Sequence, residues 1–174
     1  MRRLLLWMPV LLFAGLFALV GIGLLKPADP AVRSAMVDKD LPDFTLPALL
    51  PTKPGVARTR YGGGRVRVIN VFGSWCAPCI AEAPQLAQLK AAGVPIDGIA
   101  AGDTVDGVKA FLRRYGDPFD RIGDDKNRRA MIALGASGVP ETFVIDARGR
   151  IVRQYLSNLQ PDQVAEIIAL WKAH

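Results

Sequence analysis

Apolar residues form one long run at the beginning of the chain and return at shorter intervals after it. The run from Leu4 to Leu25 holds 22 residues without a charged side chain, and a helix of about 20 such residues crosses a bilayer. Arg2 and Arg3 precede the run, and basic residues favour the cytoplasmic side of a membrane. No convincing small-x-small cleavage site follows it. We therefore expect residues 1–26 to be an uncleaved signal anchor with one transmembrane helix.

The chain changes character after this anchor. Residues 27–40 are polar, contain two prolines and show no apolar period, which is typical of a linker. The remaining residues, 41–174, suit one domain with a single core. This domain begins with alternating apolar and polar residues over Leu41–Leu46, which predicts a short edge strand because the proline at position 42 is tolerated there.

The domain then alternates between strand-like and helix-like spacing. Residues 66–72 are rich in valine and isoleucine and predict a strand that is buried on both faces. Apolar residues at helical spacing follow from residue 77, and we expect Pro84 to kink this helix and Gly93 to end it. Similar patterns predict strands at 94–101, 142–146 and 151–156 and helices at 105–115, 128–134 and 161–171. This order indicates an α/β domain.

The net charge of +6 does not indicate a nucleic-acid partner. Without Arg2, Arg3 and Lys26, the chain has 19 basic and 16 acidic residues. The pairs of neighbouring arginines are better explained as solvated helix faces than as a phosphate-binding stripe. We therefore expect no binding to nucleic acid.

The strongest chemical signal is the segment Trp-Cys-Ala-Pro-Cys at 75–79, which contains the only two cysteines of the chain. It stands where a predicted strand ends and a predicted helix begins. A thiolate at the start of a helix is stabilised by the helix dipole and by unpaired N–H groups, which lowers its pKa. Cys76 is therefore the expected nucleophile. Cys79, within the first helical turn, is the expected resolving thiol that attacks a mixed disulfide.

Three other roles compete with a redox role for these cysteines. A structural disulfide across so short a loop would stabilise the fold little. A structural zinc site needs about four ligands, and the only histidine of the chain is His174, so we expect no metal. Two inert core thiols are the third alternative. The position of the Cys-x-x-Cys segment between a strand and a helix favours the redox role.

The element order and the cysteine motif resemble the thioredoxin fold, a mixed β-sheet flanked by helices, over roughly residues 41–171. This resemblance implies a cis-proline loop facing the dithiol, and Val139-Pro140 matches that loop. A cis bond there would present the Val139 backbone to an extended substrate peptide, whereas a trans proline would only start a strand. Trp75 is a further expected substrate contact, and its alternative role is simple packing beside the motif.

A narrower resemblance is to the DsbE/CcmG family, the thiol:disulfide interchange proteins of cytochrome c biogenesis. Residues 138–146 resemble the Gly-x-Pro-Glu-Thr-Phe segment of that family, and residues 115–119 resemble its Gly-x-Pro-aromatic insertion. Glu82 and the N-terminal anchor agree with it as well. The resemblance implies a weakly reducing protein-disulfide oxidoreductase without a cofactor, anchored in the inner membrane with its catalytic domain in the periplasm.

The same resemblance implies the partners. The electron acceptor would be apocytochrome c or a dithiol protein of haem ligation. The donor would be a transmembrane thiol reductase, because an oxidising compartment would otherwise keep Cys76 and Cys79 joined. The alternatives are a general periplasmic disulfide reductase, a disulfide donor, and a copper-carrying assembly protein with His174 as a ligand. A peroxiredoxin-like peroxidase would need a threonine two or three residues before its cysteine, where Ser74 and Gly73 stand.

Asn70 stands six residues before Cys76, where ordinary thioredoxins carry a buried aspartate. Because an amide cannot accept a proton at physiological pH, another carboxylate or water must take the proton of the resolving thiol. The candidates are Glu82, one helical turn after Cys79, and Glu141, beside the proline loop. For Glu82 the alternative is an ordinary solvated helix residue. A carboxylate close to the nucleophile would also raise its thiol pKa, which favours a reductant.

Overall fold

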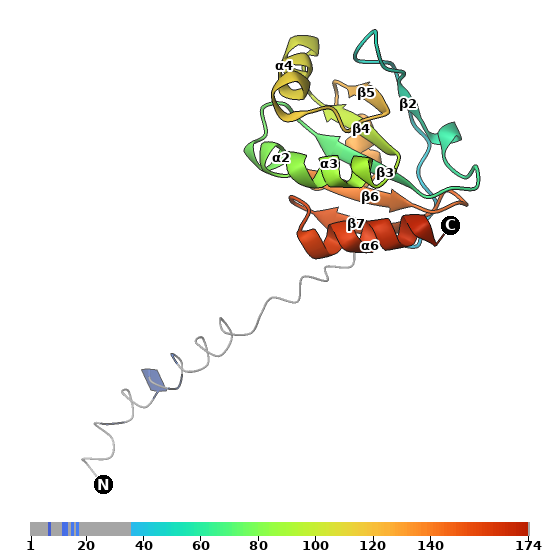
Figure 1. Ribbon diagram of the computed structural model, residues 1–174. Helices are drawn as coiled ribbons and strands as arrows, with labels where there is room; N and C mark the ends of the chain where they lie inside the picture. Colours follow the sequence, from blue (N-terminus) through green and yellow to red (C-terminus); the bar gives the residue numbers. More distant parts are fainter. Residues whose placement is uncertain (1–6, 8–11, 14, 16, 18–35, 174) are drawn as a thin grey trace. The chain divides into compact units, whose positions relative to one another are not determined.

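The computed structural model describes residues 7, 12, 13, 15, 17 and 36–173 (Figure 1). The chain divides into two compact units, Met1–Arg33 and Ser34–His174. Within the described residues, no helix has the length and apolar character that crossing a membrane requires. Most of the expected anchor and of the expected linker lies outside the described residues, so both stay predictions.

The second unit is built on a five-stranded sheet with the order β5-β4-β3-β6-β7. β4 is parallel to both β3 and β5, whereas β6 is antiparallel to both β3 and β7, so the sheet is mixed. The strands are β3 (Arg67–Phe72), β4 (Ile96–Ala101), β5 (Arg121–Asp125), β6 (Glu141–Ile145) and β7 (Ile151–Leu156). Because β3 is central and buried from its second residue onward, its carboxyl end lies in the middle of the domain.

Helices cover both faces of this sheet, and Figure 1 shows α2, α3 and α6 in front of it. The front face carries α2 (Ala77–Ala81), α3 (Ala83–Ala91), α4 (Val105–Tyr115) and α6 (Pro161–Lys172). The other face carries α5 (Arg129–Ala133) and the segment before β3. That segment forms a two-stranded sheet and one 3-10 turn: β1 (Thr45–Leu46), β2 (Val56–Ala57) and η1 (Arg58–Arg60).

The alternation of side chains along the strands separates two cores. Val144 of β6 packs in the core under α2, α3 and α6, whereas its neighbours Phe143 and Ile145 pack in the core under α5. Asn70 of β3 lies between Ile69 and Val71, which belong to the α5 side, so the Asn70 side chain points to the side of α2 and α3. The position of a buried polar residue along its strand therefore tells on which face of the sheet its side chain lies.

The predicted α/β domain with a mixed sheet and flanking helices is confirmed, and the segments 105–115 and 151–156 have the bounds that the sequence predicts. The expected edge strand at Leu41–Leu46 is reduced to Thr45–Leu46, which pairs with β2 and not with the main sheet. The helix expected from residue 77 with a kink at Pro84 is divided in two in the structure. Its first part ends at Ala81 and a second helix starts at Ala83, because Pro84 has no N–H to donate to the Ile80 carbonyl.

Candidate active site

The two cysteines form a disulfide at the carboxyl end of β3, where α2 begins. Their Cα atoms lie 5.2 Å apart. Cys76 is the N-cap of α2, and the Cys79 N–H donates to its Sγ at 3.2 Å. Cys76 is 4% exposed and Cys79 only 1%. The sulfur of Cys76 is thus the more accessible one and the one that a backbone N–H at the helix start can stabilise as a thiolate.

The loop between β3 and α2 is tied to the neighbouring strand. The Ser74 N–H and Ser74 Oγ both donate to the Asp103 carboxylate, at 2.5 and 2.8 Å. Asp103 stands two residues after the end of β4 and precedes α4, whose N-cap is Thr104. Gly107 in the first turn of α4 makes room for this contact, since a Cβ there would lie 2.6 Å from Ser74 Oγ. Residues that follow β3 and β4 therefore hold each other and fix the loop that leads to the disulfide.

The loop before β6 lies against the disulfide. The Val139-Pro140 bond is cis, as the sequence predicts. The Val139 carbonyl oxygen lies 3.5 Å from Cys76 Sγ, while Pro140 is buried and Val139 only half-buried. The structure thus brings Val139 and Pro140 to the nucleophile that the sequence predicts.

Glu82 is fully buried at the junction of α2 and α3, so the alternative of a solvated helix residue is wrong. Asn70 Nδ2 donates to Glu82 Oε1 at 2.8 Å, and the Leu159 N–H donates to Oε2 at 3.1 Å. Burial raises the pKa of Glu82 to about 7, although these two hydrogen bonds act in the opposite direction. A carboxyl group with this pKa both accepts and returns a proton at neutral pH.

Glu141 is also buried, but it belongs to the other face of the sheet. It carries 1% exposure, and alternation along β6 places it on the side of Phe143 and α5. Its Oε2 accepts from the Ser137 N–H at 2.8 Å, from the Gly138 N–H at 3.4 Å and from Ser137 Oγ, and its Oε1 accepts from Gln154 Nε2. Its Oε2 thus holds the loop that leads to Val139, while its Oε1 is engaged by β7.

Trp75 lies at the surface beside the disulfide, with 56% of its side chain exposed. Its ring rests on Gly73, where a Cβ would come within 2.7 Å of the indole. The guanidinium carbon of Arg128 lies 5.7 Å from the ring centroid. The tryptophan is therefore exposed but held in place from two directions.

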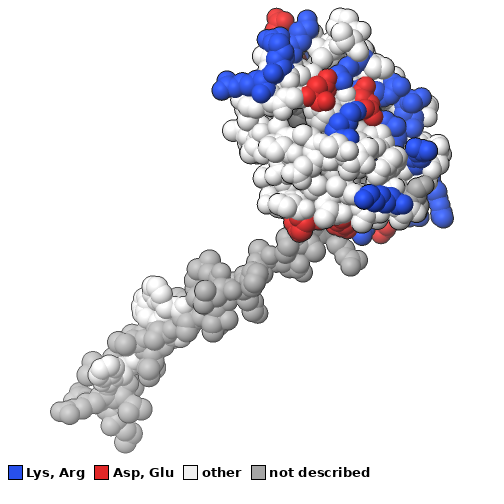
Figure 2. Space-filling model, in the orientation of Figure 1, with Lys and Arg blue, Asp and Glu red and all other residues white. Residues whose placement is uncertain are grey.

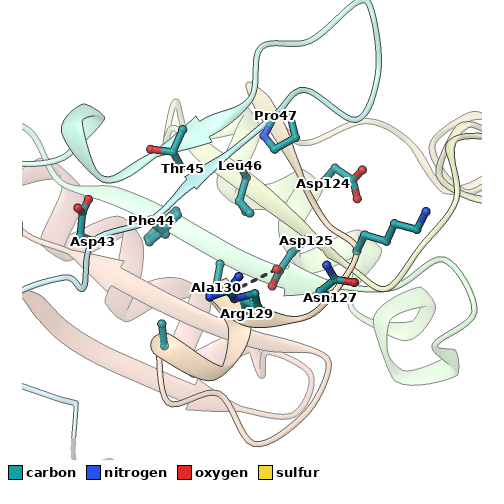
Figure 3. A pocket seen from close by; sticks show the side chains of 12 residues that line it. Asp43, Phe44, Thr45, Leu46, Pro47, Asp124, Asp125, Asn127, Arg129 and Ala130 are labelled. Carbon is teal, nitrogen blue, oxygen red and sulfur yellow. Dashed lines mark hydrogen bonds between the residues drawn. The ribbon is translucent and has the colours of Figure 1, made fainter.

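A cavity of about 560 Å³ lies apart from the disulfide, between the segment 43–47 and the turn that joins β5 to α5 (Figure 3). Asp125 at its floor accepts hydrogen bonds from the N–H groups of Ala130 and Met131. None of the residues predicted for the site lines it. Among the described residues, no group of three or more His, Cys, Asp or Glu side chains could hold a metal ion, and His174 lies outside them.

Comparisons with known proteins agree with this geometry. The model of the AhpC/TSA family matches residues 37–154. A thiol:disulfide interchange protein HelX of Rhodobacter capsulatus is 34% identical over 97% of this chain and 95% of its own length. A DsbE homolog of Paracoccus denitrificans, also named a thiol:disulfide interchange protein, is 36% identical over 87% of this chain and 84% of its own. The chain belongs to the DsbE family of thiol:disulfide interchange proteins.

A solved structure gives the same fold for this DsbE-family chain. The secreted thiol-disulfide isomerase of Corynebacterium glutamicum is 25% identical, with a TM-score of 0.61 over 76% of this chain and 85% of its own. The fold is thus thioredoxin-like, and the protein is a thiol:disulfide oxidoreductase.

Sequence reasoning missed several residues around the dithiol of this DsbE-family protein. Thr142 accepts from Asn70 Nδ2 at 3.0 Å and fixes the amide that contacts Glu82. Asp103 and Leu159 hold the loop and the buried carboxylate from elements distant in sequence. A pattern search over neighbouring residues has no signal for such contacts. For Thr142 alone, its position directly after the Pro-Glu pair could have indicated a place near the site.

Proposed function

We propose that this protein is a membrane-anchored, weakly reducing thiol:disulfide oxidoreductase of the periplasm that reduces apocytochrome c or a dithiol partner of haem ligation. The observation that carries the chemistry is the Cys76–Cys79 disulfide at the head of α2, above the buried Glu82. The sequence relatives support thiol:disulfide interchange. The segments 115–119 and 138–146 and the N-terminal apolar run support the finer assignment.

The reaction begins with the reduced dithiol. The Cys76 thiolate attacks one sulfur of a substrate disulfide, forms a mixed disulfide and releases the other substrate sulfur as a thiolate, which takes up a proton. The Cys79 thiolate then attacks Cys76 Sγ, restores the Cys76–Cys79 disulfide and releases the second substrate thiolate. Two electrons pass from the enzyme to the substrate in this sequence.

Glu82 is the proton acceptor for Cys79 in this proposal. It follows Cys79 by one helical turn on the same side of the sheet, and its raised pKa lets it take the thiol proton at neutral pH. Glu141 instead positions the loop of Val139 and Pro140, because its oxygens are occupied by Ser137, Gly138 and Gln154 on the far face.

The substrate would lie along the cis-proline loop. The backbone of Val139 and the exposed ring of Trp75 flank Cys76, so an extended peptide could pair with the loop and place its sulfur in line with Cys76. Figure 2 supports this position, since the face over α2 and α3 is almost free of charged side chains. A polypeptide can approach there without desolvating ionic groups.

The deciding experiment is a redox titration of the Cys76–Cys79 couple in glutathione or dithiothreitol buffers. A potential between those of thioredoxin and glutaredoxin, about −270 to −200 mV, is expected for a reductant. A value near about −120 mV, typical of a strong oxidant, would overturn the proposal in favour of disulfide donation.

The partner is tested by trapping. A Cys79→Ser variant should accumulate a mixed disulfide with apocytochrome c or the dithiol partner, because the resolving thiol is absent. The Cys76→Ser variant is the matched control and should accumulate none. Equal trapping by both variants contradicts the assignment of attacking and resolving roles.

A further inference from the structure

One cation contacts Trp75, the residue that precedes the predicted nucleophile Cys76. Arg128 places its guanidinium over the Trp75 ring, 5.7 Å from the centroid. On its other side is Gly102, where a Cβ would come within 2.9 Å of Arg128 Nε. A side chain at position 102 would therefore displace the guanidinium from the indole. The arginine is packed between a glycine and an aromatic ring, although it is an exposed residue.

The backbone also fixes this arginine. Arg128 has a φ of +56°, a left-handed conformation that non-glycine residues rarely adopt. Its N–H donates to the Asp125 carbonyl at 2.9 Å, and the Asp125 carboxylate holds the first turn of α5. The turn before α5 thus aims Arg128 towards Trp75, while its neighbour Arg129 lines the cavity (Figure 3).

The charge of Arg128 is not neutralised within the part of the chain that the structure describes. No carboxylate there forms an ion pair with it or with its neighbours Lys126 and Arg129. Asp125 stands three residues before Arg128, and Asp103 follows Gly102, which contacts Arg128; both carboxylates are engaged. Asp103 accepts from Ser74 and Thr104, and Asp125 accepts from the N–H groups of α5.

The helix side of the site offers no competing charge. From Cys76 to Gln88, the only ionisable side chain besides the two cysteines is the fully buried Glu82. The residues exposed there are alanines, prolines and one glutamine, at positions 77, 78, 81, 84, 87 and 88. A partner docked over the disulfide would therefore meet the unpaired positive charge of Arg128, which contacts Trp75, at the edge of an uncharged surface.

We propose that Arg128 binds a carboxylate of the partner polypeptide, carried by an acidic residue next to the cysteine that reacts with Cys76. A guanidinium stacked on an aromatic ring keeps its in-plane N–H groups for a bidentate carboxylate. The contact makes Arg128 a specificity-determining residue for the thiol exchange described above, and it rests on that proposed function.

The test uses the purified full-length chain in detergent, with Cys76 and Cys79 reduced. The substrates are two peptide disulfides of the same sequence, one with Glu and one with Gln beside the reacting cysteine. Wild type should reduce the Glu peptide about three- to fivefold faster, as for a partly exposed ion pair, and high salt should weaken this preference. Arg128→Gln should lose the preference, so that it reduces the two peptides at equal rates.

Arg129→Gln is the matched control, because it removes the same charge from the adjacent residue that lines the cavity. It should keep the preference for the Glu peptide. Equal preference in Arg128→Gln and wild type, or no preference in wild type, overturns the inference. Reduction by dithiothreitol, oxidation by the cyclic disulfide form of dithiothreitol, both of them uncharged, and reduction of the Gln peptide report the proposed function separately. If these reactions fail in wild type, the proposed function fails and not merely the role of Arg128.

Discussion

At the scale of single residues, the buried acid of this site is Glu82, which stands at another position than the buried aspartate of ordinary thioredoxins. The sequence has Asn70 where those proteins carry an aspartate, and Asn70 donates to Glu82 from across the sheet face. The buried acid is thus at the junction of α2 and α3 and not on β3, where the Asn70 amide stands and orients the Glu82 carboxyl group. Because Glu82 is buried and its pKa is about 7, it gains or loses a proton close to neutral pH.

Replacing Glu82 by Gln should slow the resolving step. The amide keeps the volume of the carboxyl group but cannot accept the Cys79 proton, and loss of a general base costs about 10²-fold or more in rate. Stopped-flow measurement of mixed-disulfide resolution against pH should show an inflection near pH 7 for wild type and none for Glu82→Gln. Glu141→Gln should keep the inflection. Its loss in Glu141→Gln would make Glu141 the base.

The same group makes stability depend on pH. The pKa of Glu82 is raised from 4.5 to about 7 in the folded protein, so the folded state holds the proton where the unfolded state has released it. The free energy of unfolding should therefore fall as pH rises from about 4.5 to 7, by about 3 kcal/mol, and stay level above that range. Denaturant titrations of oxidised protein across this range should show a smaller fall for Glu82→Gln. An identical fall in both proteins would exclude Glu82 as its cause.

At the scale of elements, short helix α5 depends on a strand that the sequence does not predict. Residues 121–125 read Arg-Ile-Gly-Asp-Asp, with one large apolar side chain, so neither strand nor helix spacing stands out. In the structure this segment is β5, which pairs with β4 and ends at Asp125. The Asp125 carboxylate then accepts from the N–H groups of Ala130 and Met131. Pairing with β4, and not local propensity, makes this strand.

Asp125→Ala should destabilise the domain by about 1–3 kcal/mol, because two N–H groups at the start of α5 lose their acceptor in a buried place. Asp124→Ala is the neighbouring control. No side-chain hydrogen bond of Asp124 is found in the described part of the chain, and its buried Oδ1 has no partner, so its loss should not destabilise the domain. Chemical denaturation measures both. Similar losses in the two variants would contradict the capping role of Asp125.

The elements that the sequence predicts well are those whose burial pattern is regular. The strand of Ile151–Leu156 and the helix of Val105–Tyr115 have clear periods and end at turns. The cysteine motif and the cis proline could be read locally as well. The burial of Glu82 could not, because it depends on Asn70 and Leu159, which come from a strand and a loop far apart in the sequence. Long-range contacts of this kind have no local period.

At the scale of the whole molecule, the described contacts of the dithiol lie within the second unit. Every contact described for Cys76, Glu82 and Trp75 comes from residues 70–159, and the Ser34–His174 unit is compact by itself. The apolar run Leu4–Leu25 lies mostly outside the described residues. The predicted role of this run is to hold the oxidoreductase at the membrane, close to a membrane-bound electron donor. This raises the effective concentration of one for the other.

Removing residues 1–26 and supplying a cleavable export signal should therefore release the protein from the membrane and leave its thiol chemistry unchanged. A helix of about 20 apolar residues anchors a protein essentially irreversibly, so the full chain should sediment with membranes and the shortened one should be recovered in the soluble periplasmic fraction. The reduction potential of the Cys76–Cys79 couple should be the same in both, since every described contact of the dithiol is kept. Cytochrome c maturation should fall with the shortened chain, because encounter with the membrane donor becomes diffusional. A shortened chain that still sediments with membranes would show that another segment binds there.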